Sequence, residues 1–133
     1  MIVVDASVVV ELLLKTPRSE RILQRLFEPA DALHAPHLLD VEVAQVLRRY
    51  ERQGELSVRR GAAALRLLEA LPLRRHPHTP LLNRVWTLRQ NFTAYDAIYV
   101  ALAEVLDATL VTLDAALVAA PGTHARIELV SDG

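Results

Sequence analysis

The sequence predicts a single α/β domain, built from a central parallel sheet with helices on both faces. Short β-branched and aliphatic runs, such as residues 1–4 and 109–112, are typical of buried parallel strands. These runs alternate with longer segments in which apolar residues recur at helical spacing. The chain of 133 residues has no internal repeat, linker or low-complexity tract, so we expect one domain over residues 1–133.

The expected strands are short and have clear ends. Asp5 follows the first apolar run, Pro36 stops the second, and a turn at residues 107–108 leads into a later one. The predicted strands are residues 1–4, 33–35, 109–112 and 126–130, and the connecting segment 73–78 is a candidate for a further strand.

Most of the expected helices have a recognisable start or stop. Ser7 is a natural N-cap for the first helix, Pro17 suits the first turn of the second, and Gly54 ends the third. The predicted helices are residues 8–14, 19–27, 37–53, 57–71, 80–89, 94–106 and 114–120.

The helix that begins at Ala94 is apolar on nearly every face, which is typical of a helix buried in the middle of a domain. Thr93 and Asp96 have the spacing of a capping box, with Thr93 as the N-cap. Asp96 lies in the first turn, where free backbone N–H groups favour a carboxylate. The position suits an ordinary cap, a cation ligand or a proton-transfer group.

Composition excludes several classes of site. The chain has no cysteine, so disulfides, thiolate zinc sites and cysteine nucleophiles are excluded, and a reducing cytoplasm is the expected location. The first residues lack the positive region of a signal peptide, and no apolar run reaches the length of about 20 residues needed to span a bilayer. The net charge of −1 gives no overall attraction to nucleic acid.

Four carboxylates are predicted at strand ends or on apolar helices. Asp5 and Asp114 follow strands, at the edge where open α/β sheets bind ligands. Asp96 opens the buried helix, and Glu42 borders the apolar face of the helix over residues 37–53. Each has a simpler explanation, since the three aspartates can cap helices and Glu42 can pair with Arg48 or Arg49. Together they favour a hard cation, Mg²⁺ or Mn²⁺, that activates water against a phosphodiester.

The segments around these four acids, residues 3–7, 38–47, 93–97 and 110–114, resemble the PIN domain, and most closely the VapC-type ribonuclease toxins of bacterial toxin–antitoxin pairs. The resemblance extends over essentially the whole chain. It implies a metal-dependent endoribonuclease whose acidic quartet holds one or two Mg²⁺ or Mn²⁺ ions. The quartet would be Asp5, Glu42, Asp96 and Asp114.

The resemblance also implies roles for further residues and partners. Ser7 and Thr112 would be hydroxyls that orient the carboxylates or waters. Relatives are dimers, and a cognate VapB-type antitoxin lies over their active groove. Where many of them carry Asn three residues after the helical Glu, this chain has Gln45, which bears on the fine geometry of the site.

Other signals are weaker. Arg84 and Arg89 precede the Asp96 segment and are the preferred candidates for contact with the RNA backbone. Five arginines can form a phosphate-binding face, although a solvated helix surface is the favoured interpretation: Arg48, Arg49, Arg52, Arg59 and Arg60. The His76-Pro77-His78 pair lacks a third ligand, so a zinc site is not favoured.

Two alternatives to the nuclease remain. One is a PIN-like module that binds protein or RNA without cutting it. The other is a haloacid-dehalogenase-like phosphohydrolase, which also uses an aspartate after its first strand. That chemistry requires a second aspartate two residues later and a lysine late in the chain. Here Ser7 occupies the first position and Lys15 is the only lysine, so this alternative is disfavoured.

Overall fold

The computed structural model describes residues 1–130, and residues 131–133 of the expected domain lie outside the described part. Its parallel sheet has the strand order β3-β2-β1-β4-β5, which no sequence pattern specified. The strands are β1 (Ile2–Val4), β2 (Leu33–Pro36), β3 (Leu73–His76), β4 (Thr109–Thr112) and β5 (Arg126–Leu129). The predicted strands are therefore confirmed, including the candidate within residues 73–78, and Pro36 is the last residue of β2 rather than a residue beyond it.

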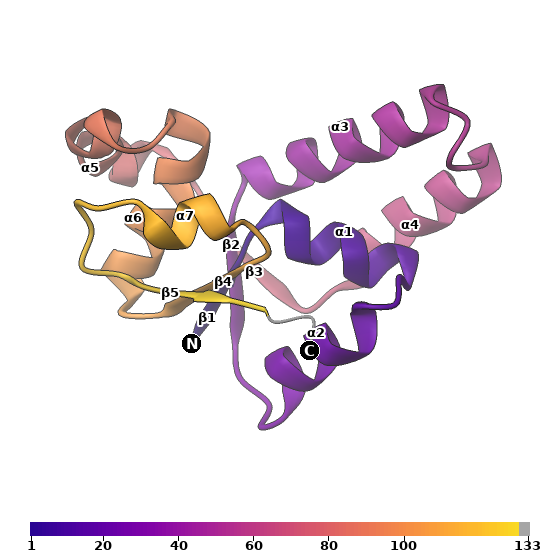
Figure 1. The fold of residues 1–133 in the computed structure, drawn as a ribbon, viewed down its shortest axis with the longest axis horizontal. Coiled ribbons are helices and arrows are strands. Elements are labelled where there is room, and N and C mark those ends of the chain that lie inside the picture. The colour runs from indigo at the N-terminus through magenta and orange to yellow at the C-terminus, as the bar shows by residue number, and fades with distance from the viewer. Residues whose placement is uncertain (131–133) are drawn as a thin grey trace.

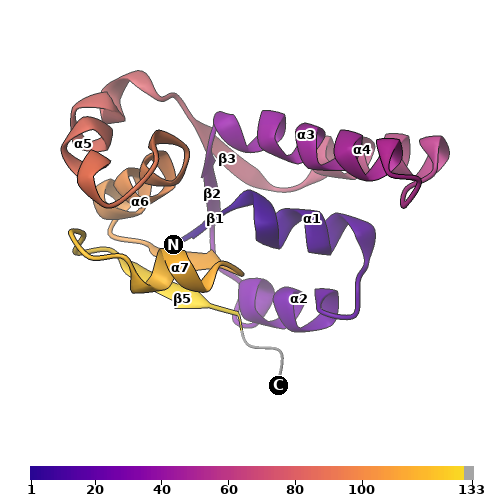
Figure 2. The ribbon, with the colours of Figure 1, turned by 45° about the horizontal axis from the view of Figure 1, so that its top comes forward.

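The helices divide into two groups around this sheet (Figure 1). One group is α1 (Ala6–Leu14), α2 (Ser19–Phe27), α3 (Leu38–Arg52) and α4 (Val58–Ala70). The other is α5 (Leu82–Thr87) and α6 (Ala94–Leu106), and α7 (Ala115–Ala119) packs on β4 and β5. Figure 2 shows α3 and α4 as an antiparallel pair that extends past α1. The predicted segment 80–89 is divided between α5 and two 3₁₀ turns, η1 (Thr79–Leu81) and η2 (Leu88–Gln90).

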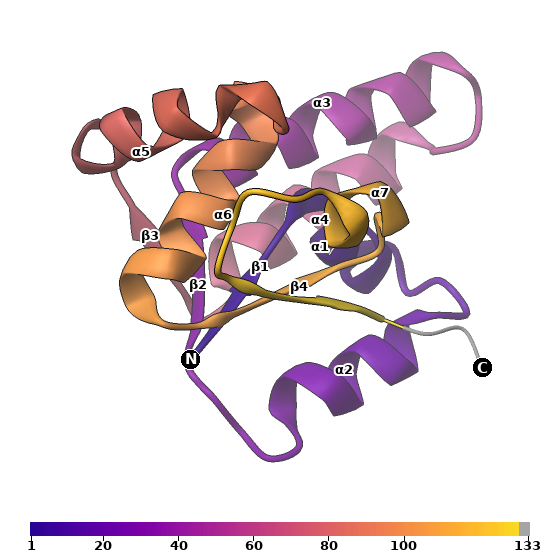
Figure 3. The same cartoon turned by 60° about the vertical axis from the view of Figure 1, so that its left-hand side comes forward.

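The buried core extends over both faces of the sheet, and α6 supplies its largest continuous run of buried residues. Every residue from Ala97 to Ala103 is buried, as the apolar sequence of this helix predicts. Helix α6 packs on β1, β2 and β4, the strands at the centre of the sheet (Figure 3). The expected N-cap begins this helix, since the Thr93 hydroxyl accepts a hydrogen bond from the Asp96 N–H at 3.1 Å. This packing fixes the start of α6 relative to the ends of the strands.

The first helix begins two residues earlier than the predicted range of residues 8–14. Asp5, and not Ser7, is the N-cap of α1, and its carboxylate accepts the Val8 N–H at 3.2 Å. Ser7 lies inside the first turn, where its hydroxyl is available for other contacts. No helix within residues 1–130 is long and apolar enough to cross a membrane.

Candidate active site

The four predicted carboxylates come from the elements that meet at the carboxyl ends of the central strands. Asp5 directly follows β1 and Asp114 follows β4, and these strands are neighbours with Val4 paired to Val111. The chain leaves β1 toward β2 and β3 and returns on the other side as β4, so the topological switch point lies between β1 and β4. Glu42 lies in the second turn of α3, and Asp96 in the first turn of α6.

Asp5 is held by three donors. Its Oδ1 accepts the Ser7 hydroxyl at 2.6 Å and the Val8 N–H, and its Oδ2 accepts the Thr112 hydroxyl at 2.5 Å. Only 9% of the residue is exposed. Burial raises the pKa of Asp5, the charge of Asp114 raises it further, and the three hydrogen bonds oppose both effects. The side chain is thus fixed in position, while the charge it carries is incompletely compensated.

Glu42 meets a residue that sequence reasoning missed. The Tyr99 hydroxyl, on α6, donates a hydrogen bond of 2.5 Å to Glu42 Oε1. Tyr99 is 3% exposed, and burial together with the Glu42 charge raises the pKa of its phenol. Burial also raises the pKa of Glu42, and the charges of Asp96 and Asp5 add to that rise. A tyrosine within a wholly apolar helix is the signal that was available, because its buried O–H requires a partner.

Of the other two acids, Asp96 is half-buried like Glu42, and Asp114 is exposed. Asp114 is the N-cap of α7, where its Oδ1 accepts the Ala116 N–H at 2.9 Å, and its own N–H donates to Thr112 Oγ1 at 3.0 Å. Burial raises the pKa of Asp96, and the charges of Asp114 and Asp5 raise it further. Asp5 and Asp114 are therefore N-caps, as the capping interpretation predicts, and Asp96 lies in the first turn behind the Thr93 cap.

Capping does not account for the acids as a group. Asp114 raises the pKa of Asp5, Asp96 and Asp5 raise the pKa of Glu42, and Asp114 and Asp5 raise the pKa of Asp96, so each acid is close enough to at least one other for their charges to interact. Within residues 1–130 none of the four pairs with an arginine, lysine or histidine, and Glu42 contacts Tyr99 instead of Arg48 or Arg49. Asp40, the neighbouring acid on α3, pairs with Arg75 on another side of the helix.

The donor chemistry of this cluster fits a hard divalent cation. All four side chains offer carboxylate oxygens, and the net negative charge they share has no basic counterpart among the described residues. Their resting positions do not form a complete ligand shell, because no three acidic or histidine side chains within residues 1–130 are arranged to hold one ion together. Binding would require side-chain rotation or ligands from water or substrate.

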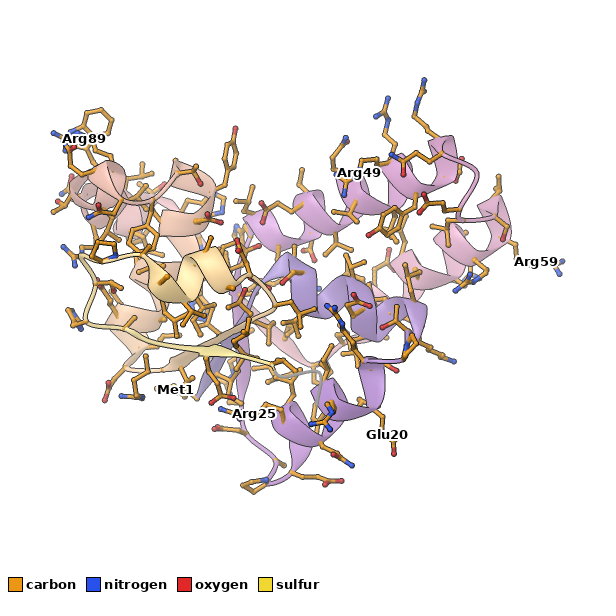
Figure 4. All side chains as sticks on the ribbon, viewed as in Figure 1. Met1, Glu20, Arg25, Arg49, Arg59 and Arg89 are labelled. Atoms are coloured by element: carbon orange, nitrogen blue, oxygen red, sulfur yellow. The ribbon has the colours of Figure 1, made fainter. Side chains whose placement is uncertain are left out.

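The two arginines expected to contact RNA, Arg84 and Arg89, have different surroundings. The Arg84 guanidinium forms two hydrogen bonds with the Glu104 carboxylate, at 2.6 and 3.0 Å. This pairing gives Arg84 a structural role, because the Glu104 side chain is only 5% exposed and Arg84 supplies its counter-charge. Contact of Arg84 with RNA stays a prediction. Arg89 is exposed and lies over the Trp86 ring, with its guanidinium carbon 4.5 Å from the ring centroid (Figure 4).

The histidines and Gln45 lie away from this cluster or contribute no contact to it. His76 Nε2 is 2.9 Å from His34 Nδ1, and the His78 ring accepts the Leu38 N–H at the start of α3. These contacts give His76 and His78 structural roles and leave the zinc interpretation unsupported. Gln45 is exposed on α3, and no hydrogen bond ties its amide to another residue of the described chain.

Comparison with known proteins gives a consistent picture. Residues 2–122 match the PIN domain model. Over 129 residues the chain is 46% identical to Ribonuclease VapC1 of Mycobacterium tuberculosis (strain CDC 1551 / Oshkosh), covering 96% of each chain. It is 40% identical over 131 residues to Ribonuclease VapC12 of the same strain, covering 98% of this chain and all of that one. The crystal structure of VapBC2 from Rickettsia felis, bound to a DNA fragment from its promoter, has the same fold, with a TM-score of 0.73, 15% identity and coverage of 98% and 100%.

Proposed function

This chain belongs to the PIN-domain family and, within it, to the VapC ribonucleases, and from that premise we propose that it is the toxin of a toxin–antitoxin pair, an endoribonuclease that hydrolyses RNA phosphodiesters with a divalent metal. The observation that carries the proposal is the cluster at the switch point: four mutually repelling carboxylates that no basic side chain of residues 1–130 neutralises. Helix capping is local to each helix end and does not require the four carboxylates to lie close together.

In this proposal Asp5, Glu42, Asp96 and Asp114 hold Mg²⁺, or Mn²⁺ in its place. A cation bound there polarises the scissile phosphate and lowers the pKa of water. Ser7 and Thr112 orient Asp5 from either side by donating to its two oxygens. Tyr99 fixes the side-chain rotamer of Glu42 by donating to Oε1. That rotamer also sets the direction of the second oxygen, Oε2, which does not accept the Tyr99 hydroxyl.

The partners follow from the same assignment. The substrate is RNA, and the proposed inhibitor is a VapB-type antitoxin, in keeping with the VapBC2 assembly whose fold this chain shares.

We also propose a homodimer. It is supported by large apolar side chains that stay exposed on three helices: Val41 on α3, Leu82 and Trp86 on α5, and Tyr95 on α6. The cytoplasm, where cellular RNA is available, is the proposed place of action.

The test is RNA cleavage by purified protein, with Mg²⁺, with Mn²⁺ and with a chelator, beside the variant Asp96→Asn. We expect cleavage that needs the metal and is lost in the variant. Binding without cleavage would favour the catalytically silent module. Cleavage in the presence of chelator would refute the metal site.

The phosphohydrolase alternative loses further support from the position of its lysine. Lys15 is the C-cap residue of α1, at the end of that helix opposite Asp5. A lysine there cannot neutralise a phosphate carried on Asp5.

A further inference from the structure

A groove lies along the side of α1, and two of its lining residues adjoin the acidic cluster. It has a volume of about 310 Å³, and its lining includes Ser7, Leu113 and Arg49. Ser7 is hydrogen-bonded to Asp5, and Leu113 precedes Asp114, so one end of the groove adjoins two of the four carboxylates. A second groove, of about 460 Å³, shares Tyr50 with the first and continues to Lys15 and Arg60. The two grooves together are lined by the basic side chains Arg18, Arg49, Lys15 and Arg60 and by the acidic side chains Glu11 and Glu55.

Arg49 is placed to act together with the acidic cluster. It follows Glu42 by seven residues on α3, which corresponds to two helical turns and about 10 Å along the axis, so the two side chains share a face. Val46, between them on that face, lines the same groove. The Arg49 side chain is exposed and has no ion pair within residues 1–130, and its guanidinium carbon lies 5.7 Å from the centroid of the Tyr50 ring.

The remaining arginines of the basic helix pair are placed differently. Arg48 lines a separate groove against α4. Arg60 donates to the Leu14 carbonyl at 3.3 Å, and Arg59 projects from α4 away from the acidic cluster (Figure 4). The other arginine of the first groove, Arg18, lies 3.9 Å from the Glu11 carboxylate. Of the five arginines that the sequence groups together, Arg49 is the one that lines the groove beside the acidic cluster.

We propose that this groove holds the RNA strand beside the cleavage site, and that Arg49 binds a backbone phosphate next to the scissile one. The inference rests on the proposed function for its substrate. Its physical basis is charge: the carboxylates repel RNA unless a cation covers them, so the affinity for the strand must come from positive side chains nearby. A guanidinium is the side chain best shaped for a phosphate, and one without an acidic partner has that capacity available.

The experiment measures RNA binding separately from cleavage. The protein carries Asp96→Asn, the probe is a fluorescein-labelled pool of random single-stranded RNA, and binding is followed by anisotropy between about 50 and about 200 mM salt. Arg49→Gln is expected to weaken binding about three- to ten-fold and to reduce the slope of log K against log salt by about 0.7, the loss of one phosphate contact. Arg49→Lys should restore part of the affinity. Arg48→Gln, with the same change of net charge, should leave affinity within about two-fold and the slope unchanged.

Cleavage by the same variants without Asp96→Asn gives a second measurement. Arg49→Gln should raise KM and leave kcat near that of the parent protein. Equal effects of Arg49→Gln and Arg48→Gln would overturn the inference, as would a loss of antitoxin binding with no loss of RNA binding. A parent protein that cleaves RNA while Arg49→Gln binds RNA normally would refute the inference alone. A parent protein that binds RNA through Arg49 and never cleaves would refute only the proposed function.

Discussion

The Thr112 hydroxyl connects two acids of the cluster: it donates to Asp5 Oδ2 at 2.5 Å and accepts the Asp114 N–H at 3.0 Å. Thr112 is the last residue of β4 and is fully buried. One side chain therefore sets the position of the carboxylate after β1 and of the backbone after β4. The relative placement of these two acids depends on a hydroxyl that has no charge of its own.

Replacing Thr112 with valine keeps the shape of the side chain and removes both contacts. Loss of the donor should raise the pKa of Asp5 further, so that the acidic limb of the pH–rate profile moves to higher pH and activity at neutral pH falls. Stability should fall by about 1–3 kcal/mol, the cost of a buried hydrogen bond to a charged group. Thr109→Val, on the same strand with a single contact of 3.3 Å to Arg126, is the control and should keep the parent profile. An unchanged profile in Thr112→Val would contradict this role.

Tyr99→Phe tests the contact that fixes Glu42. Without the phenol the carboxylate loses its donor and its fixed rotamer, so Mn²⁺ affinity, measured by calorimetry, should fall about ten-fold or more. Tyr95→Phe, on the exposed side of the same helix, removes a hydroxyl of the same kind and should bind Mn²⁺ like the parent. If both variants bind Mn²⁺ equally well, Glu42 does not depend on Tyr99.

The raised pKa values of Asp5, Glu42 and Asp96 predict how metal-free stability depends on pH. The folded protein holds these protons more tightly than the unfolded chain, so the free energy of unfolding should decrease as pH rises from the ordinary values of 3.8 for Asp and 4.5 for Glu through the raised folded values. Asp96→Asn should therefore raise the Tm of metal-free protein at neutral pH and have little effect near pH 4. A lower Tm at neutral pH would contradict this.

Bound metal should offset the loss of stability that the unneutralised carboxylates cause at neutral pH. At about 100 times its Kd, a bound Mg²⁺ ion adds about 2.7 kcal/mol to the free energy of unfolding. The rise in Tm should be present at neutral pH, shrink as the carboxylates take up protons, and be much smaller in Asp96→Asn. Thermal melts across a Mg²⁺ titration at two pH values measure it, and an equal rise in the variant would exclude Asp96 as a ligand.

Arg84 is predicted to matter for stability rather than for RNA. Arg84→Gln would remove the guanidinium from the buried Glu104 and leave the Thr123 hydroxyl as a donor to it, so the free energy of unfolding should fall by about 2–4 kcal/mol, measured by urea denaturation. The salt dependence of RNA binding should stay at the parent value. Arg89→Gln, which removes an exposed guanidinium from the Trp86 ring, should change stability by less than about 1 kcal/mol. Weakened RNA binding by a fully stable Arg84→Gln protein would restore the sequence-based assignment.

Much of the local structure follows from local chemistry. Thr93 and Asp96 predicted the start of α6, Gly54 marked the end of α3 with a φ of 77°, and residues 19–27 form α2 with the expected bounds. These features depend on residues a few positions apart, so a sequence pattern contains the information. The alternation of strands and helices likewise predicted the parallel sheet and both helical layers.

The features that were missed all depend on distant residues. Tyr99 meets Glu42 across 57 positions, and Arg84 meets Glu104 across 20, and no periodicity encodes either contact. The strand order has the same origin, since the neighbours of β1 are set by crossovers. Asp5 was expected near Asp114 because both follow strands, but the hydroxyl between them depends on the register of β1 with β4.

The pairing of β1 with β4 has a consequence for synthesis of the protein. The central strand of the sheet begins at residue 2, and its partner ends at residue 112, so a chain emerging from the ribosome carries Asp5 long before the strand that completes its surroundings. Such long-range pairing forms late in folding. Asp5 and Asp114 are therefore not brought together until the chain has been synthesised through β4, which delays the formation of the site during synthesis.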